Sequence, residues 1–189
     1  MSVRIHSAFD YRWAVIVLLS CLAACLTLFS TSRYGPGLTP DSADYIRLAR
    51  DILENGFSFL LEHKAVDQPP LYPMALAASS SLTGMSILHA ARGINLLASA
   101  GLVAVILLCI SRFTRSVLVL VLIGLLASLS IPLTQVWSMT WTEPLFLWMV
   151  SMVFFLVSGT RHHRLAVLTA GLFTAAACLM RYAGIVLLP

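Results

Sequence analysis

The sequence has little charge. Only 11% of its 189 residues are Asp, Glu, Lys or Arg, whereas a soluble domain carries about 25%. Apolar residues make up 59% of the chain and the mean hydropathy is +0.91. This composition excludes an ordinary soluble domain and predicts an integral membrane protein. The net charge of +4 comes from short basic clusters between apolar runs. That pattern is typical of membrane topology rather than of nucleic-acid binding.

The sequence also lacks the cysteine and histidine spacing of a metal site. All four cysteines fall inside apolar runs, which is typical of small buried side chains. They are Cys21, Cys25, Cys109 and Cys178. His63 lies near Glu62 and Asp67 and could join a metal site, but no fixed ligand spacing surrounds it. We therefore assign no metal ligand. The cofactor is left unknown, with a divalent cation as one possibility.

Acidic residues are few and confined to one window. Six of the eight lie between Asp41 and Asp67. The window opens with a helix start, because Thr39 can act as N-cap and Pro40 suits the first helical position. Apolar residues then recur at helical spacing from Tyr45 until Asn55-Gly56 ends the pattern. We predict a short interfacial helix from 40 to about 54.

Five apolar runs predict an all-α, polytopic membrane fold. The predicted spans cover residues 13–30, 87–110, 116–133, 144–157 and 165–188, the last interrupted by Arg181. The alternative for the first run is a cleaved signal peptide. We favour an anchor, because no small-x-small cleavage site follows the run. The loop 31–86 is expected to hold a second short helix from Met74 to Leu82, after an extended or turning proline-rich segment from Pro69 to Pro73.

The basic residues orient these spans by the positive-inside rule. One side of the membrane receives three basic groups, at Arg4 and Arg12, at Arg112 and Arg115, and at Arg161 and Arg164 with His162 and His163. The other side receives the acidic loop and the turn 134–143, which has no Lys or Arg. We expect a cytoplasmic N-terminus and an outward acidic loop. The chain ends apolar, at Pro189, and we expect it to be the N-terminal portion of a longer protein.

Three carboxylates are candidates for catalysis on the outer side. Asp41 and Asp44 could act as a general base and its helper or as cation ligands, and the alternative is plain helix capping. Glu143 precedes Pro144 at the start of the fourth span. It could cap that helix, or it could point into a cavity.

Two arginines near the outer span ends are candidates for substrate binding. Snorkelling to the headgroups is one interpretation for Arg92 and Arg181, and a phosphate clamp is the other. Carboxylates alone would repel a lipid phosphate, so a cation is needed. We favour an arginine over a metal, because the chain offers no dedicated ligand spacing.

Several motifs resemble the GT-C membrane glycosyltransferases, which include bacterial relatives of protein O-mannosyltransferases and the aminoarabinose transferase acting on lipid A. The segment from Pro40 to Gly56 resembles their first outer loop. The similarity continues, in order, at Gln68–Pro73, Ala91-Arg92, Thr142–Phe146 and Arg181–Pro189.

The resemblance implies an acidic residue acting at the acceptor, which would be Asp41, and a sugar donor linked to a polyprenyl phosphate. The family often has Asp-Glu where this chain has Asp41-Ser42. We name Asp41, Asp44 and Glu143 as catalytic candidates. Tyr45, Tyr72, Arg92 and Arg181 are the substrate-binding candidates.

The function expected from the sequence is sugar transfer to an unknown acceptor at the outer face of the cytoplasmic (inner) membrane. A transporter subunit is one rival, although it would be expected to carry ionisable groups at the membrane midplane. A non-catalytic scaffold or a truncated remnant is the other. No nucleic-acid partner is expected.

Overall fold

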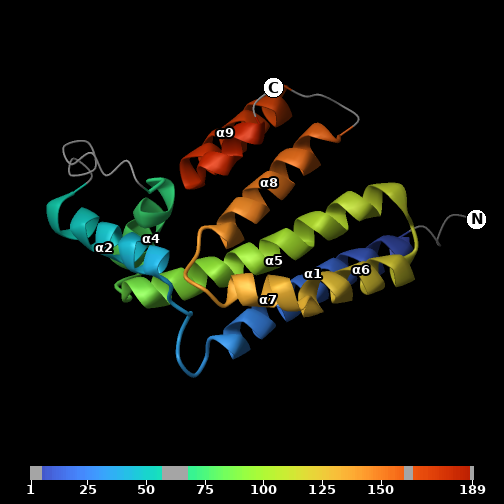
Figure 1. Cartoon of the computed structure of the whole chain (residues 1–189). Coiled ribbons are helices and arrows are strands. Elements are labelled where there is room, and N and C mark those ends of the chain that lie inside the picture. Colours follow the sequence, from blue (N-terminus) through green and yellow to red (C-terminus); the bar gives the residue numbers. More distant parts are fainter. Residues whose placement is uncertain (1–5, 57–67, 160–163, 188–189) are drawn as a thin grey trace, which may run out of the picture.

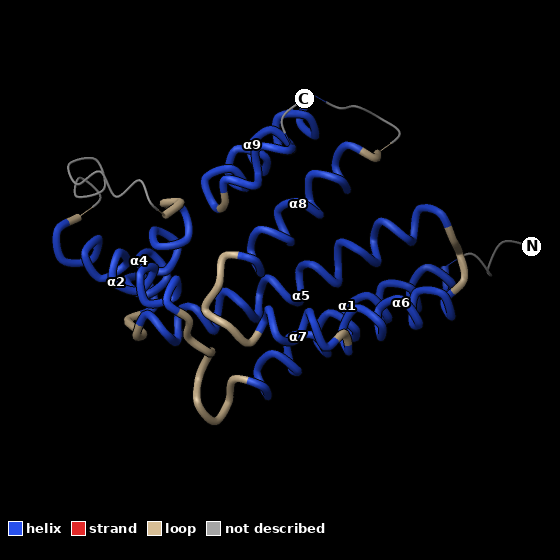
Figure 2. The backbone as a smooth tube through the Cα atoms, viewed as in Figure 1, coloured by secondary structure: helices blue, strands red, loops and turns tan. Residues whose placement is uncertain are grey.

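The computed structural model describes residues 6–56, 68–159 and 164–187, and the elements there are helical (Figures 1 and 2). They are α1 (His6–Ser30), α2 (Pro40–Asn55), α4 (Leu71–Thr83), α5 (Ile87–Phe113), α6 (Val117–Leu129), α7 (Ile131–Trp137), α8 (Glu143–Val157), α9 (Arg164–Met180) and the 3₁₀ helix η1 (Tyr182–Leu187). The all-α prediction is confirmed for these residues. The proposed metal role of His63, with Glu62 and Asp67, lies outside them, as do the basic positions 4 and 161–163.

Among the described residues, two helices are long and apolar enough to cross a membrane. They are α1, over Tyr11–Ser30, and the 27-residue α5. The pair α6 and α7 is a third candidate if both count as one span. Helices α8 and α9 are apolar but only 15 and 17 residues long. Large apolar side chains such as Leu18, Leu126 and Leu172 are exposed on the outside of these helices, as expected where lipid replaces water.

The predicted third span, 116–133, is not one straight helix. α6 ends at Leu129, Ser130 is extended (φ −62°, ψ 116°), and α7 continues at an angle of 56°. Pro132 explains the break. It has no N–H to donate to the carbonyl of Ser128, and its ring would clash with that carbonyl in a continuous helix.

The predicted fifth span, 165–188, is interrupted at Arg181 as expected, and its second part is not α-helical. α9 ends at Met180, and residues 182–187 form the 3₁₀ helix η1. η1 folds back onto α9. A Cβ atom on Gly184 would lie 2.5 Å from the backbone of Ala177, so only glycine allows this close approach.

The two short helices of the acidic loop are both present. α2 matches its predicted bounds, with Gly56 as C-cap. α4 begins at Leu71, earlier than predicted, so the extended segment predicted to reach Pro73 is wrong. Pro73 fits because it lies in the first turn, where a backbone N–H has no intrahelical partner.

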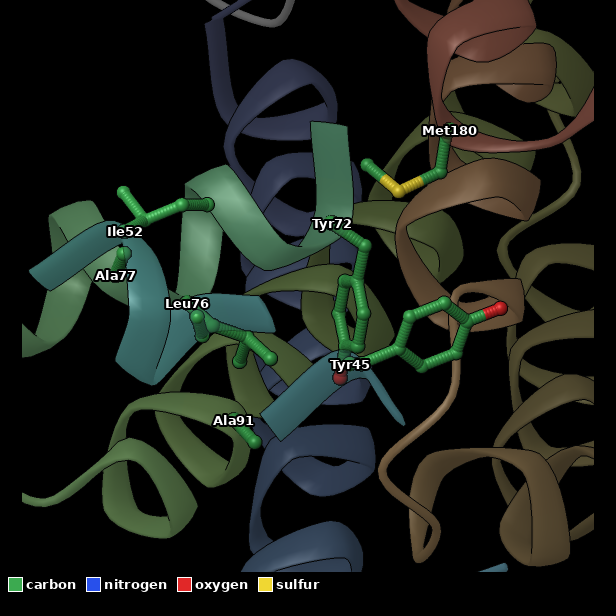
Figure 3. Close-up of a cluster of buried hydrophobic side chains, with 8 residues drawn as sticks. Tyr45, Ile52, Tyr72, Leu76, Ala77, Ala91 and Met180 are labelled. Carbon is green, nitrogen blue, oxygen red and sulfur yellow. The ribbon is translucent and has the colours of Figure 1, made fainter. Parts of the chain in front are cut away.

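The helices pack in two groups around α5. α1, α5 and α6 bury one core, which contains Ile16, Leu19, Val103, Leu107 and Leu120. α8 packs between α5 and α9, and α2 and α4 cover the start of α5 (Figure 1). A second core joins α2, α4 and α5 with Met180, the last residue of α9 (Figure 3).

Basic side chains link the helix ends at the end of the bundle opposite α2 and α4. Arg12 Nη2 donates to the carbonyl oxygens of Ser111 (2.6 Å) and Thr114 (2.8 Å). Arg112 Nη1 donates to the carbonyl of Phe155 (2.7 Å), and the guanidinium lies 3.8 Å from that ring's centroid. The start of α1 and the ends of α5 and α8 therefore meet at one end. The two ends of the bundle differ in charge, as the sequence predicts.

Candidate functional site

The candidate site begins at the first turn of α2. Thr39 is the N-cap, and its hydroxyl accepts from the backbone N–H of Ser42 (3.3 Å). The Ser42 hydroxyl accepts from the backbone N–H of Thr39 (3.0 Å), which completes a capping box. Pro40 occupies the first helical position. Asp41 follows in the first turn, exposed to solvent.

The loop before α8 is held against this turn. Gly37 N–H donates to Ser138 O (2.7 Å), and Thr140 N–H donates to Gly37 O (2.9 Å). The Ser42 hydroxyl also donates to Thr140 O (2.9 Å). Trp141 Nε1 donates to the Thr39 hydroxyl (3.0 Å). These bonds join two segments about 100 residues apart.

Asn95 fixes the same loop from the other side. This buried residue of α5 donates from Nδ2 to the carbonyls of Trp137 (2.8 Å) and Met139 (2.7 Å). These bonds give both carbonyls a partner. Because a buried carbonyl without a partner is costly, Asn95 stabilises the loop in this position. The position of Glu143 is thereby set relative to α2.

A cavity of about 220 Å³ opens where these segments meet. Four of the seven predicted site residues line it: Asp41 and Tyr45 from α2, Glu143 from α8, and Arg181 from just after α9. The rest of the lining is Thr39, Pro40, Trp141 and Thr142. Sequence reasoning missed Trp141 and Thr142 as site residues, although both adjoin Glu143. Their roles depend on the tertiary contact with α2, which no local pattern predicts.

Arg181 and Glu143 form an ion pair in this cavity. Arg181 Nη1 contacts Glu143 Oε1 and also donates to the Thr142 hydroxyl (3.4 Å). Both charged side chains are half-buried. Both of these contacts are made by Nη1, and the Nε–Nη2 edge lies on the other side of the guanidinium. That edge of the guanidinium is the fork that binds a phosphate or carboxylate with two parallel bonds.

Asp41 and Tyr45 lie one helical turn apart on the α2 side of the cavity. Asp41 forms no ion pair with any described residue. Tyr45 is buried, and burial raises the pKa of its phenol. A hydrogen bond with the Thr142 side chain lowers that pKa, the charges of Asp41 and Glu143 raise it, and Arg181 lowers it. The cavity thus holds an accessible carboxylate beside a neutral phenol.

The other three predicted residues lie elsewhere. Asp44 pairs with Arg47 (3.2 Å) on the surface of α2. Tyr72 is fully buried behind Tyr45, with ring centroids 5.3 Å apart and the rings edge to face (Figure 3). Burial raises the pKa of Tyr72. Arg92 lines a different cavity, between α1 and α5.

Within residues 6–56, 68–159 and 164–187 no group of three or more His, Cys, Asp or Glu side chains is placed to hold a metal ion. The Asp41 cavity offers two carboxylates and one arginine. Such a set can accept a proton at Asp41 and can bind an anion at the Nε–Nη2 edge of Arg181.

Comparison of the chain with protein families, with curated proteins and with solved structures gave no match.

Proposed function

We propose that the chain is a membrane glycosyltransferase of the GT-C type, which transfers a sugar from a polyprenyl-phosphate donor to an acceptor hydroxyl. The motifs around Asp41, Arg92, Glu143 and Arg181 support this proposal by resemblance. One structural observation carries it further. Asp41, which has no ion pair with a described residue, and Arg181, which is paired with Glu143, share one cavity although they lie far apart in the sequence.

In this proposal α1, α5, the bent pair α6–α7, α8 and α9 form five membrane segments. α2 and α4 lie at the outer interface of the cytoplasmic membrane, and the N-terminus is cytoplasmic. The amphipathic α2 supports this placement, because its buried residues share one face and its charges lie on the others. The basic residues at the far end of the bundle support it as well.

The proposed chemistry uses the three charged side chains of the cavity. Asp41 accepts the proton of the acceptor hydroxyl while the hydroxyl oxygen bonds to the anomeric carbon of the sugar. The bond between that carbon and the phosphate oxygen breaks, and the polyprenyl phosphate leaves with the electron pair. The Nε–Nη2 edge of Arg181 stabilises the phosphate charge. Glu143 holds Arg181 in place through the ion pair.

A transporter is less well supported. The middle turns of α1, α5, α6, α8 and α9 contain no Asp, Glu, Lys, Arg or His. A substrate or ion path usually places ionisable groups at that depth.

The test is sugar transfer by the chain in proteoliposomes, supplied with a panel of undecaprenyl-phosphate-linked sugars. Asp41→Asn should abolish donor consumption, a loss of about 100-fold or more, because a general base contributes about 10²–10⁴. Asp51→Asn is the matched control on the same helix and should keep most of the activity. Equal losses in the two variants would contradict the role of Asp41.

Donor binding tests Arg181 separately. Arg181→Gln should weaken binding of the lipid-linked donor about tenfold, which corresponds to about 1.4 kcal/mol. Binding by the unchanged protein should survive a chelator. Binding that is lost on chelation and indifferent to Arg181 would show that a metal ion holds the phosphate instead.

A further inference from the structure

A second cavity, which we call the Arg33–Arg92 pocket, lies between the end of α1 and the start of α5. Its volume is about 300 Å³. The loop from Thr31 to Pro36 forms one wall, and the first turns of α5 form the other. It shares no lining residue with the Asp41 cavity.

The charge of this pocket is positive. Arg33 and Arg92 both line it, and none of the described lining residues is acidic. The Asp41 cavity is different, because its two carboxylates outnumber its one arginine. An anion that reaches this end of the protein is therefore attracted more strongly to the Arg33–Arg92 pocket.

Both arginines line the pocket, and Arg92 is held in place by a bond to α1. Arg92 Nη2 donates to the carbonyl of Leu28 (3.0 Å), in the last turn of α1. Arg92 Nε is buried, and no described residue accepts its hydrogen. The Arg33 guanidinium lies 5.2 Å from the ring centroid of Tyr34. That cation–π contact leaves the N–H edge of the guanidinium available.

Donors from α5 complete the lining. Ser86 is the N-cap of α5, and its hydroxyl is 2.7 Å from His89 Nδ1. This bond leaves the other ring nitrogen of the exposed His89 for a ligand. The N–H groups in the first turn of α5 add a partial positive charge beside the two arginines.

The pocket lies where an apolar helix ends. α1 is a candidate membrane span that ends at Ser30, just before the pocket wall. Phe29, in the last turn, is 80% exposed, and Leu28 is exposed as well. A ligand with a charged head and a hydrocarbon tail can place its head between the arginines and its tail along α1.

We propose that the Arg33–Arg92 pocket binds a phosphate monoester, the headgroup of an anionic membrane lipid. Two guanidinium groups match the oxygens of a phosphate monoester, and the exposed apolar turn of α1 matches an acyl chain. The same phosphate chemistry occurs in soluble metabolites, so the test includes a soluble competitor. This site shares no lining residue with the cavity of the proposed sugar transfer.

The test is lipid binding to the purified chain in neutral detergent, followed by native mass spectrometry. Phosphatidic acid should bind at least about tenfold more tightly than phosphatidylcholine, since charge-assisted bonds to arginine are the strong ones. Arg33→Gln should reduce phosphatidic acid binding about fivefold or more. Arg47→Gln makes the same charge change at the same end of the molecule and should leave binding within about twofold.

Arg92→Gln should also weaken binding, but it removes a bond between α5 and α1 and can affect folding. Arg33 is exposed, so Arg33→Gln is the deciding variant. Displacement of phosphatidic acid by millimolar glycerol 3-phosphate would identify a soluble phosphate as the ligand, and no displacement would identify the lipid. Equal binding of the two lipids, or equal losses in Arg33→Gln and Arg47→Gln, would overturn the proposal.

Discussion

At the scale of single residues, Ser42 both caps α2 and joins it to the loop before α8. Ser42 is the third residue of α2, where a capping box usually has Glu or Gln reaching back to the N-cap N–H. The serine hydroxyl makes that bond itself and also donates to Thr140 O. A serine here fills the role that Glu or Gln usually has in a capping box. Asp41, the residue before Ser42, is the carboxylate of α2 that lines the cavity.

We expect Tyr45 to make the protein less stable at alkaline pH. Burial raises the pKa of its phenol above the ordinary value of 10.0. The stabilising effect of the neutral phenol is thus fully present below about pH 10 and is lost as the pH rises through the folded-state pKa. We expect the thermal midpoint in detergent to fall as the pH increases from about 9 to 11, and Tyr45→Phe to make this fall shallower.

Tyr11→Phe is the control for this experiment, because Tyr11 is 67% exposed at the other end of the bundle. Its pH profile should match that of the unchanged protein. If Tyr45→Phe and Tyr11→Phe gave the same profile, Tyr45 would not be responsible for the loss of stability.

At the scale of elements, the capping box couples α2 to the loop before α8. Ser42→Ala removes two contacts within the cap, with the N–H and the hydroxyl of Thr39, and one bond to Thr140 O. Loss of a cap costs about 0.5–2 kcal/mol and an unsatisfied buried acceptor costs about 1–3 kcal/mol. We expect a destabilisation of about 1–3 kcal/mol, measured as the midpoint of denaturant unfolding. Ser81→Ala changes an exposed serine on α4 and should change the midpoint little.

Local signals explain which elements were predicted well. α2 carries its N-cap, its proline and its glycine stop within 18 residues, from Thr39 to Gly56, so its bounds follow from the sequence. The break between α6 and α7 also has a local cause in Pro132, but an uninterrupted apolar run hides it from a hydropathy argument. The return of η1 onto α9 depends on the contact between Gly184 and Ala177. No periodic sequence pattern predicts that contact.

At the scale of the whole molecule, the candidate site follows only in part from the sequence. Counting spans places Asp41, Glu143 and Arg181 on one side of the membrane, and the structure gathers them in one cavity. The same count places Arg92 on that side of the membrane. Arg92 does not line the Asp41 cavity, however, and donates to the carbonyl of Leu28 at the end of α1. Side of the membrane is a coarse property. Which residues touch depends on how α2 packs against the loop before α8.

The charge difference between the two ends of the bundle predicts how the protein lies in a membrane. The end with Arg12, Arg112 and Arg115 should face the cytoplasm, and the end with α2 and α4 should face outward. In a variant without the four native cysteines, Ser81→Cys on α4 and Ser116→Cys before α6 report on opposite ends, and both positions are exposed. A membrane-impermeant maleimide added to intact cells should label Ser81→Cys only. In inverted vesicles it should label Ser116→Cys only. Labelling of Ser116→Cys from outside intact cells would reverse the orientation and would place the Asp41 cavity on the cytoplasmic side.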